Sequence, residues 1–147
     1  MNSTIDHKET KPPLKYGDIT SAIIGCAMRV HQKMKNGYVE SVYHKCLAIE
    51  LAKAGINFTH EVDMPIYYEG ELVGRRRVDF MVEEKIAVEL KALSELTDAH
   101  LAQGLNYLET HNLEVGLLIN FGAKSLQFKR LINDKGMQRN PANPINP

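Results

Sequence analysis

The stretch RVDFMVEEKIAVELKA, residues 77–92, constrains the fold more than any other part of the chain. Its alternate positions are apolar, and they hold Val78, Phe80, Val82, Ile86, Val88 and Leu90. Because side chains alternate between the two faces of a β-strand, this pattern predicts two strands, 71–82 and 86–91, that share one apolar face. The interleaved positions hold the charged residues Arg77, Asp79, Glu89 and Lys91.

The length of the loop between these strands decides which charged side chains meet. A loop over 83–85 places Asp79 directly opposite Glu89, with Lys91 two residues further along the same face. A two-residue loop would instead pair Asp79 with Val88 and mix the faces. A slip of one residue moves a whole apolar set to the wrong face, so burial favours the first register.

Two carboxylates directly opposite each other repel, and the pattern leaves two ways to offset this repulsion. In the first, Arg77 and Lys91, which face each other in this register, neutralise the pair on a solvated face of the sheet. In the second, a divalent cation lies between Asp79 and Glu89. Oxygen ligands suit Mg²⁺ or Mn²⁺, and Mg²⁺ typically takes one or two protein carboxylates and keeps its waters. Lys91 would then offer a positive charge to a phosphate oxygen or to the attacking water.

The composition fits one domain. The chain has 147 residues with 44% hydrophobic content, enough for a core. We expect a single domain over 16–133, flanked by flexible segments at 1–15 and 134–147. The 18 basic residues balance the 18 acidic ones, which argues against avid non-specific nucleic-acid binding but leaves a local patch open.

Several sequence features favour a cytoplasmic protein that does not enter a membrane. No apolar run approaches the roughly 20 residues that cross a bilayer, and the N-terminal residues lack the apolar stretch of a signal peptide. Cys26 and Cys46 lie in apolar, helix-patterned segments, which favours reduced core residues. The histidines show no i, i+4 pair, so a zinc site is not expected.

The periodicity predicts helices at 19–35, 39–54 and 98–110 and strands at 61–68, 71–82, 86–91, 115–121 and 126–131. Pro65 favours an edge position or a bulge for the first strand. The order ααβββαββ is typical of an α/β or α+β sandwich in which helices cover a mixed sheet.

The chemistry-bearing residues match a known pattern. Asp79, followed on the hairpin by Glu89-Leu90-Lys91, resembles the motif of the PD-(D/E)XK nuclease superfamily, with Val78 in place of the motif's proline. The segment Gly37-Tyr38-Val39-Glu40-Ser41-Val42-Tyr43 resembles the signature of the GxxExxY protein family, a branch of that superfamily. The resemblance extends from about Ile19 to Leu131. It implies a restriction-endonuclease-like core.

The GxxExxY resemblance implies that Glu40, at the start of a helix over the sheet, is a further acidic residue of the site. The residues by themselves offer another explanation. Gly37 as N-cap with Glu40 at the third helical position would form a capping arrangement, which favours a carboxylate on its own. Tyr43, one turn later, either braces Glu40 or belongs to the core.

The helix at 98–110 carries a second organised face. Leucines 101, 105 and 108 lie on one side, while His100, Gln103 and Tyr107 cluster on the other. Q-x-x-x-Y resembles an element of the superfamily's exonuclease-like branch, which implies that Gln103 supports the catalytic lysine or the scissile phosphate. A solvated helix face is the alternative.

Together these observations predict a metal-dependent nuclease that acts on nucleic acid, DNA more than RNA. Asp79, Glu89 and the carbonyl of Leu90 would bind Mg²⁺ or Mn²⁺, and Glu40 would hold a second metal or its water. Lys91 would orient the attacking water.

Gln103 and Tyr107 would position the phosphate or the lysine. We expect Glu40, Asp79, Glu89, Lys91 and Gln103 to converge in one cleft.

The flanking arginines and the wider role of the fold stay open. Arg75 and Arg77, placed by strand alternation on the site's face, would grip backbone phosphates or keep a sheet edge soluble. A binding module without catalysis, or a subunit that needs a protein partner or a second copy, is the alternative to an active nuclease.

Overall fold

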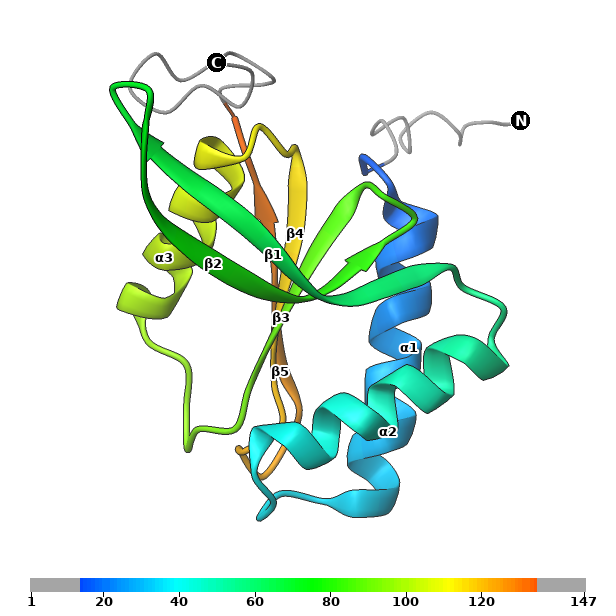
Figure 1. Cartoon of the computed structure of the whole chain (residues 1–147). Helices are drawn as coiled ribbons and strands as arrows, with labels where there is room; N and C mark the ends of the chain where they lie inside the picture. The colour runs from blue at the N-terminus through cyan, green and yellow to red at the C-terminus, as the bar shows by residue number, and fades with distance from the viewer. Residues whose placement is uncertain (1–13, 135–147) are drawn as a thin grey trace, which may run out of the picture.

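The computed structural model describes residues 14–134 (Figure 1), and its elements follow the predicted order. The helices are α1 (Gly17–Met34), α2 (Glu40–Lys53) and α3 (Asp98–Thr110). The strands are β1 (Phe58–Tyr68), β2 (Glu71–Val82), β3 (Ile86–Lys91), β4 (Val115–Asn120) and β5 (Gln127–Ile132). The bounds of β2, β3 and α3 are those predicted, whereas β1 begins three residues earlier than 61. The segments expected to be flexible, 1–15 and 134–147, lie almost entirely outside the described residues.

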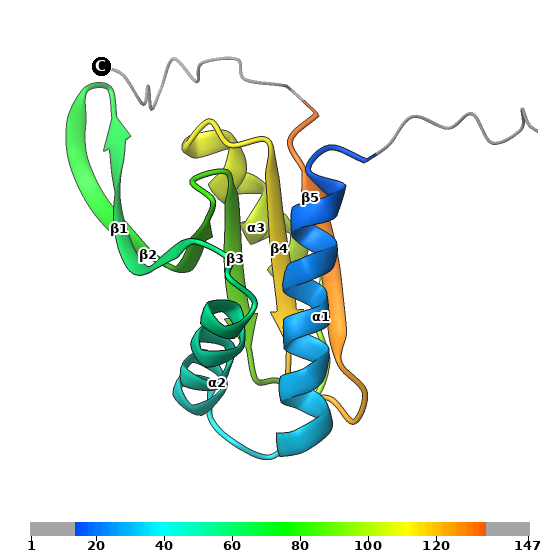
Figure 2. The same cartoon turned by 90° about the vertical axis from the view of Figure 1, so that its right-hand side faces the viewer.

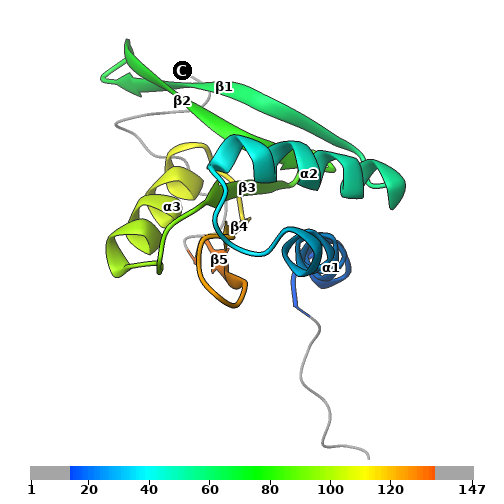
Figure 3. The ribbon, with the colours of Figure 1, turned by 90° about the horizontal axis from the view of Figure 1, so that it is seen from below.

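The strands form one mixed sheet in the order β1-β2-β3-β4-β5. Only the β3–β4 pair is parallel, because α3 carries the chain across between these two strands. Helices α1 and α2 cover one face of the sheet and α3 covers the other (Figures 2 and 3). The predicted sandwich of helices on a mixed sheet is confirmed.

The register between β2 and β3 is the one that the three-residue loop predicts. Val82 pairs with Ile86 and Phe80 with Val88. The ladder ends there, so Asp79 stands at the point where β2 leaves β3. Beyond that point β2 pairs only with β1, and the β1–β2 ribbon turns away from the rest of the sheet (Figure 2).

This separation overturns two details of the hairpin prediction. Arg77 does not face Lys91; its guanidinium Nε lies 3.3 Å from Oδ1 of Asp63 on β1. The alternating apolar residues are all buried, but they do not share one face. Phe80 packs in the cluster under α1 and α2, whereas Val78 packs in the cluster under α3. The strong twist of β2 at Asp79 turns the same side of the strand from one layer to the other.

The structure shows the local roles of several residues. β1 is an edge strand with a register shift at Ile66, as Pro65 suggested. Thr97 caps α3 through a capping box with His100. Cys26 is buried, Cys46 is half-buried, and both thiols are free. Within residues 14–134, no helix is long and apolar enough to span a membrane.

Candidate active site

Asp79 is fixed where the two central strands separate. The backbone N–H of Leu90, which has no ladder partner on β2 at this point, donates to Oδ2 of Asp79 at 2.7 Å. The other oxygen, Oδ1, lies 3.6 Å from Nδ1 of His44 on α2. The carboxylate of Asp79 is therefore held between β3 and α2, at the point where β2 and β3 separate.

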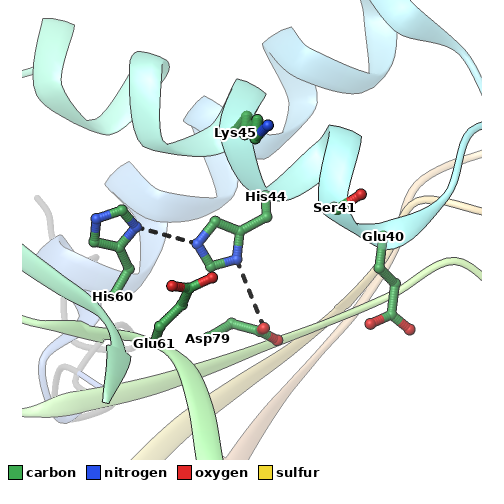
Figure 4. A pocket seen from close by; sticks show the side chains of 7 residues that line it. All are labelled: Glu40, Ser41, His44, Lys45, His60, Glu61 and Asp79. Carbon is green, nitrogen blue, oxygen red and sulfur yellow. Dashed lines mark hydrogen bonds and ion pairs between the residues drawn. The ribbon is translucent and has the colours of Figure 1, made fainter.

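His44 belongs to a short chain of polar contacts behind Asp79 (Figure 4). Its ring stacks on Phe80 with centroids 4.3 Å apart, and its Nε2 lies 3.2 Å from Nδ1 of His60 on β1. Sequence reasoning missed His44, because its partners come from β1 and β2 and no short spacing signals the contact. The sequence offered one hint: His44 lies one helical turn after Glu40 and therefore on the same side of α2.

Glu40 and Asp79 share a cavity of about 460 Å³ between α2 and the sheet (Figure 4). Its lining consists of Glu40, Ser41, His44, Lys45, His60, Glu61 and Asp79. Glu40 is the first residue of α2, where the helix dipole favours a carboxylate. The expected capping role of Gly37 is wrong: Val39 is the N-cap, and Gly37 occupies a turn with φ of 120° that suits glycine.

Tyr43 supports the loop that leads into Glu40. Its ring is fully buried and stacks on Phe121, with centroids 4.7 Å apart and an interplanar angle of 11°. Its hydroxyl donates to the carbonyl of Lys35 at 2.5 Å and accepts from the N–H of Tyr38 at 3.2 Å. The structure thus places Tyr43 in the core, under the loop and not in the cavity.

We expect Tyr43→Phe to lower the free energy of unfolding by about 1 kcal/mol, because the ring packing survives and the two hydroxyl hydrogen bonds are lost. Urea unfolding measures this change. Tyr38→Phe, which keeps the backbone N–H, is the control and should have no comparable effect. An unchanged stability of Tyr43→Phe would contradict the bracing role.

Glu89 points to the α3 side of the sheet, where its carboxylate contacts the guanidinium of Arg76. The sequence did not indicate this contact. Nη2 of Arg76 lies 2.9 Å from Oε1 of Glu89, and the side chain of Glu89 is only 16% exposed. Burial raises the pKa of Glu89, the positive charge of Arg76 opposes this shift, and Asp79 adds to it. The positive charge of Lys91 also acts on Glu89. Asp79 and Lys91 are therefore both within electrostatic reach of Glu89.

The arginine beside the candidate site is thus Arg76, and not Arg75 or Arg77. Strand alternation had assigned the odd-numbered arginines to the site. The twist of β2 at Asp79 instead turns Val78 and Arg76 towards α3, while Arg75 and Arg77 are exposed.

The second face predicted for α3 is only partly present. Tyr107 is buried against the sheet beside Leu108, because a helix packed on a sheet buries a wide stripe. Burial and the nearby charge of Glu89 raise the pKa of Tyr107. Gln103 is exposed.

The single cleft that the sequence predicted is divided. Glu40 and Asp79 line the cavity at α2, while Glu89 and Tyr107 line a space of about 10 Å³ at α3. Gln103 lines neither of these two. Asp79 and Lys91 act electrostatically on Glu89, Glu40 lines the same cavity as Asp79, and Gln103 lines neither space.

Comparison with known proteins agrees with the fold. A family model described as the PD-(D/E)XK nuclease superfamily matches residues 17–131. The chain belongs to this superfamily. The crystal structure of SSO0001 has a similar fold, with a TM-score of 0.51 and 18% sequence identity over 78% of this chain and 65% of that chain. This chain therefore spans less than two thirds of that neighbour's length. No curated protein matches the chain.

PD-(D/E)XK nucleases generally use divalent metals, and the oxygen donors here fit such an ion. Within residues 14–134, no three His, Cys, Asp or Glu side chains gather closely enough to hold a metal by themselves. Mg²⁺ requires fewer, since one or two carboxylates and a backbone carbonyl suffice when it keeps its waters. Leu90 engages Oδ2 of Asp79 and Arg76 engages Oε1 of Glu89, while Oδ1 of Asp79 lies 3.6 Å from Nδ1 of His44. Oxygen donors of this kind suit Mg²⁺ or Mn²⁺.

Asn120 positions the chain that follows the superfamily's acid-x-Lys strand. It is fully buried next to Lys91 in the β3–β4 register. Its Oδ1 accepts from the N–H groups of Leu93 at 2.8 Å and Gly122 at 3.1 Å. Its Nδ2 donates to the carbonyl of Leu93 and to Oε1 of Gln127, both at 2.9 Å. Sequence reasoning missed Asn120 because it ends a strand of otherwise apolar residues and gives no catalytic signal.

His111 gives the fold a distinctive pH dependence. Burial, together with the charge of Arg76, lowers the pKa of His111 to about 4. The unfolded chain binds this proton near pH 6.5, so the neutral histidine's contribution to stability is complete above that pH. It is lost as the pH falls from about 6.5 towards 4.

We therefore expect His111→Gln to lose less stability than the wild type between pH 7 and pH 4.5. Urea unfolding at both pH values measures the difference. The shift of Glu89 is common to both proteins and cancels in the comparison. A parallel loss of stability in the two proteins would exclude His111 as the titrating group.

Proposed function

We propose that this chain is a divalent-metal-dependent nuclease that hydrolyses phosphodiester bonds in nucleic acid, DNA more than RNA. One observation carries the proposal. At the point where β2 leaves β3, the charges of Asp79 and Lys91 both act on the half-buried carboxylate of Glu89. Membership of the PD-(D/E)XK nuclease superfamily supports it, and Asp79 with Glu89-Leu90-Lys91 resembles the superfamily's motif. We further propose the GxxExxY branch, on the segment from Gly37 to Tyr43.

In the proposed mechanism Asp79, Glu89 and the carbonyl of Leu90 would hold Mg²⁺ or Mn²⁺. The ion would polarise the scissile phosphate and activate the attacking water. The N–H of Leu90 keeps Asp79 in its orientation. Glu40, on the same cavity as Asp79, would hold a second ion or a water.

Lys91 orients the attacking water and stabilises the charge that develops on the phosphate. It is half-buried at the end of β3, which limits its freedom and strengthens its charge relative to an exposed lysine. A positioned cation of this kind acts mainly in the transition state, so its loss should lower the rate more than the affinity.

The exposed residues around this centre would contact the substrate. Arg75 and Arg77 lie exposed along β2, where they would grip backbone phosphates. Gln103 is exposed on α3 and would reach a strand that passes between α3 and the β1–β2 ribbon. Tyr107 is buried, so its part in binding would run through Arg76, whose guanidinium lies 5.1 Å from the centre of its ring.

One observation favours a second candidate function, a nucleic-acid-binding module without catalysis. Arg76 already neutralises Glu89 at 2.9 Å, as a permanent ion pair would in a protein that holds no metal. A balanced net charge would suit a binding module with limited affinity.

Cleavage assays separate the two candidates. The purified chain is incubated with linear, circular, branched and single-stranded DNA and with RNA, in Mg²⁺, Mn²⁺ or EDTA. We expect cleavage of at least one substrate that EDTA abolishes and that Glu89→Ala and Lys91→Ala both lose. Binding without cleavage by the wild type would contradict the nuclease proposal for this chain. Cleavage by both variants at the rate of the wild type would contradict it as well.

A further inference from the structure

Arg76 contacts the candidate metal ligand Glu89 although it lies outside the superfamily's motif. On β2 it pairs in register with Met64 of β1, beyond the point where β2 and β3 separate. Its side chain crosses this separation to reach Glu89, with Nη2 2.9 Å from Oε1. The ring of Tyr107 lies beside the guanidinium, 5.1 Å from Cζ to the ring centre. The ion pair between Arg76 and Glu89 therefore connects β2 and β3 beyond the end of their hydrogen-bonded ladder.

The surroundings of Glu89 explain why a cation is needed there. Its carboxylate is 16% exposed, and Asp79 lies within electrostatic reach. A desolvated carboxylate near a second one is costly unless a positive charge compensates. In the described structure Arg76 supplies this charge. A divalent ion between the two carboxylates would supply more of it, so the ion and Arg76 satisfy the same group.

We propose that Arg76 is an exchangeable counter-ion. It neutralises Glu89 while the metal is absent, and it moves to a backbone phosphate of the nucleic acid when a divalent ion binds Asp79 and Glu89. A planar guanidinium pairs with carboxylate and phosphate oxygens in the same way, so the exchange needs no new chemistry. The side chain of Arg76 is 29% exposed, and a phosphate can therefore reach it from solvent. The phosphate half of this inference rests on the proposed function.

The exchange predicts effects of opposite sign when Arg76 is removed. Arg76→Leu should bind Mn²⁺ about tenfold more tightly, because a competing cation is gone from Glu89. The same variant should bind DNA about tenfold more weakly, because one charged phosphate contact is lost. A merely structural ion pair predicts that both affinities fall, since its loss would disorder Glu89.

Calorimetric titration with Mn²⁺ alone tests the first half on the intact chain. Fluorescence anisotropy with a short DNA duplex in Ca²⁺ tests the second half, with all proteins carrying Lys91→Ala to prevent cleavage. The matched control is Arg29→Leu, which removes an arginine from a different Arg–Glu pair, that of Arg29 and Glu50 at 3.1 Å between α1 and α2. Arg29→Leu should leave Mn²⁺ binding and duplex binding unchanged.

Tighter Mn²⁺ binding and weaker duplex binding by Arg76→Leu would support the exchange. Unchanged or weaker Mn²⁺ binding would overturn it. If Arg76→Leu is unstable, thermal unfolding still reports the metal, and Mn²⁺ should raise its melting temperature more than that of the wild type. In Glu89→Gln no buried carboxylate needs compensation, and adding Arg76→Leu there should still weaken duplex binding. Unchanged duplex binding by this double variant would overturn the phosphate half.

These results remain distinct from a failure of the proposed function. A wild type that cleaves nothing contradicts the nuclease proposal, while the Mn²⁺ titrations still decide whether Arg76 competes with the metal. A wild type that cleaves normally, beside an Arg76→Leu variant with unaltered Mn²⁺ affinity, keeps the nuclease and rejects the exchange.

Discussion

Lys91→Met is expected to lower the single-turnover rate of cleavage at least about 10³-fold, with only a small change in substrate affinity. Removing one preorganised group that stabilises developing charge typically costs about 10² to 10³ in rate, and Lys91 is also proposed to orient the water. Methionine keeps most of the volume and the apolar stem of lysine, so the end of β3 should stay packed. The measurement is the rate at saturating enzyme in Mg²⁺, with circular dichroism to show that the variant is folded.

The control for this prediction is Lys85→Met. Lys85 is an exposed lysine of the loop at 83–85, at the other end of β3 from Lys91. Its loss changes the net charge equally but removes nothing from the site. Lys85→Met should cleave at the rate of the wild type. A Lys91→Met rate within tenfold of that control would show that Lys91 takes no part in the chemical step.

Asn120→Ala should lower the free energy of unfolding by about 3 kcal/mol, the largest stability effect we expect among these variants. Alanine leaves the N–H and C=O of Leu93 and the N–H of Gly122 without their partner. A buried group that loses its partner costs about 1 to 3 kcal/mol. Gly122 limits relaxation, because a side chain at that position would already lie 2.4 Å from the backbone N of Leu93.

Urea unfolding measures the loss, and Asn133→Ala provides the comparison. Asn133 is also buried and donates from Nδ2 to the carbonyl of Leu113 at 3.0 Å, but it lies beyond β5 and away from Lys91. Both variants should be less stable than the wild type. Only Asn120→Ala should also slow cleavage under conditions where the protein is folded. Equal cleavage rates would show that the Asn120 network stabilises the fold without positioning the site.

The hairpin shows how far sequence reasoning reaches. Alternation and burial were enough to fix the pairing of Val82 with Ile86, because any slip would expose a whole apolar face. The same reasoning placed Asp79 directly opposite Glu89, but the β2–β3 ladder ends one pair earlier, at Phe80 and Val88. It failed at Arg77, two residues before Asp79, because strict alternation of side chains between two faces assumes a flat strand. Beyond Asp79, β2 pairs only with β1, and a local pattern does not contain this separation from β3.

The residues that sequence reasoning missed share a physical reason. His44, Arg76 and Asn120 all act through contacts between elements far apart in the chain, at separations of 35, 13 and 27 residues. None belongs to a short motif. By contrast, Glu40 was indicated by its motif, and its cavity position beside Asp79 follows from the packing of α2 on the sheet. Gln103 was indicated in the same way, yet its side chain is exposed on α3 and lines neither cavity of the site.

The central claim is that Asp79 and Glu89 form one metal centre, and anomalous scattering from a crystal soaked in Mn²⁺ tests it most directly. We predict one strong anomalous peak between the two carboxylates, with the carbonyl of Leu90 as a further ligand and oxygen distances of about 2.1–2.2 Å. The guanidinium of Arg76 should have left Glu89 in the same crystal. A peak elsewhere on the chain, or no peak at Mn²⁺ concentrations that support cleavage, would contradict the account.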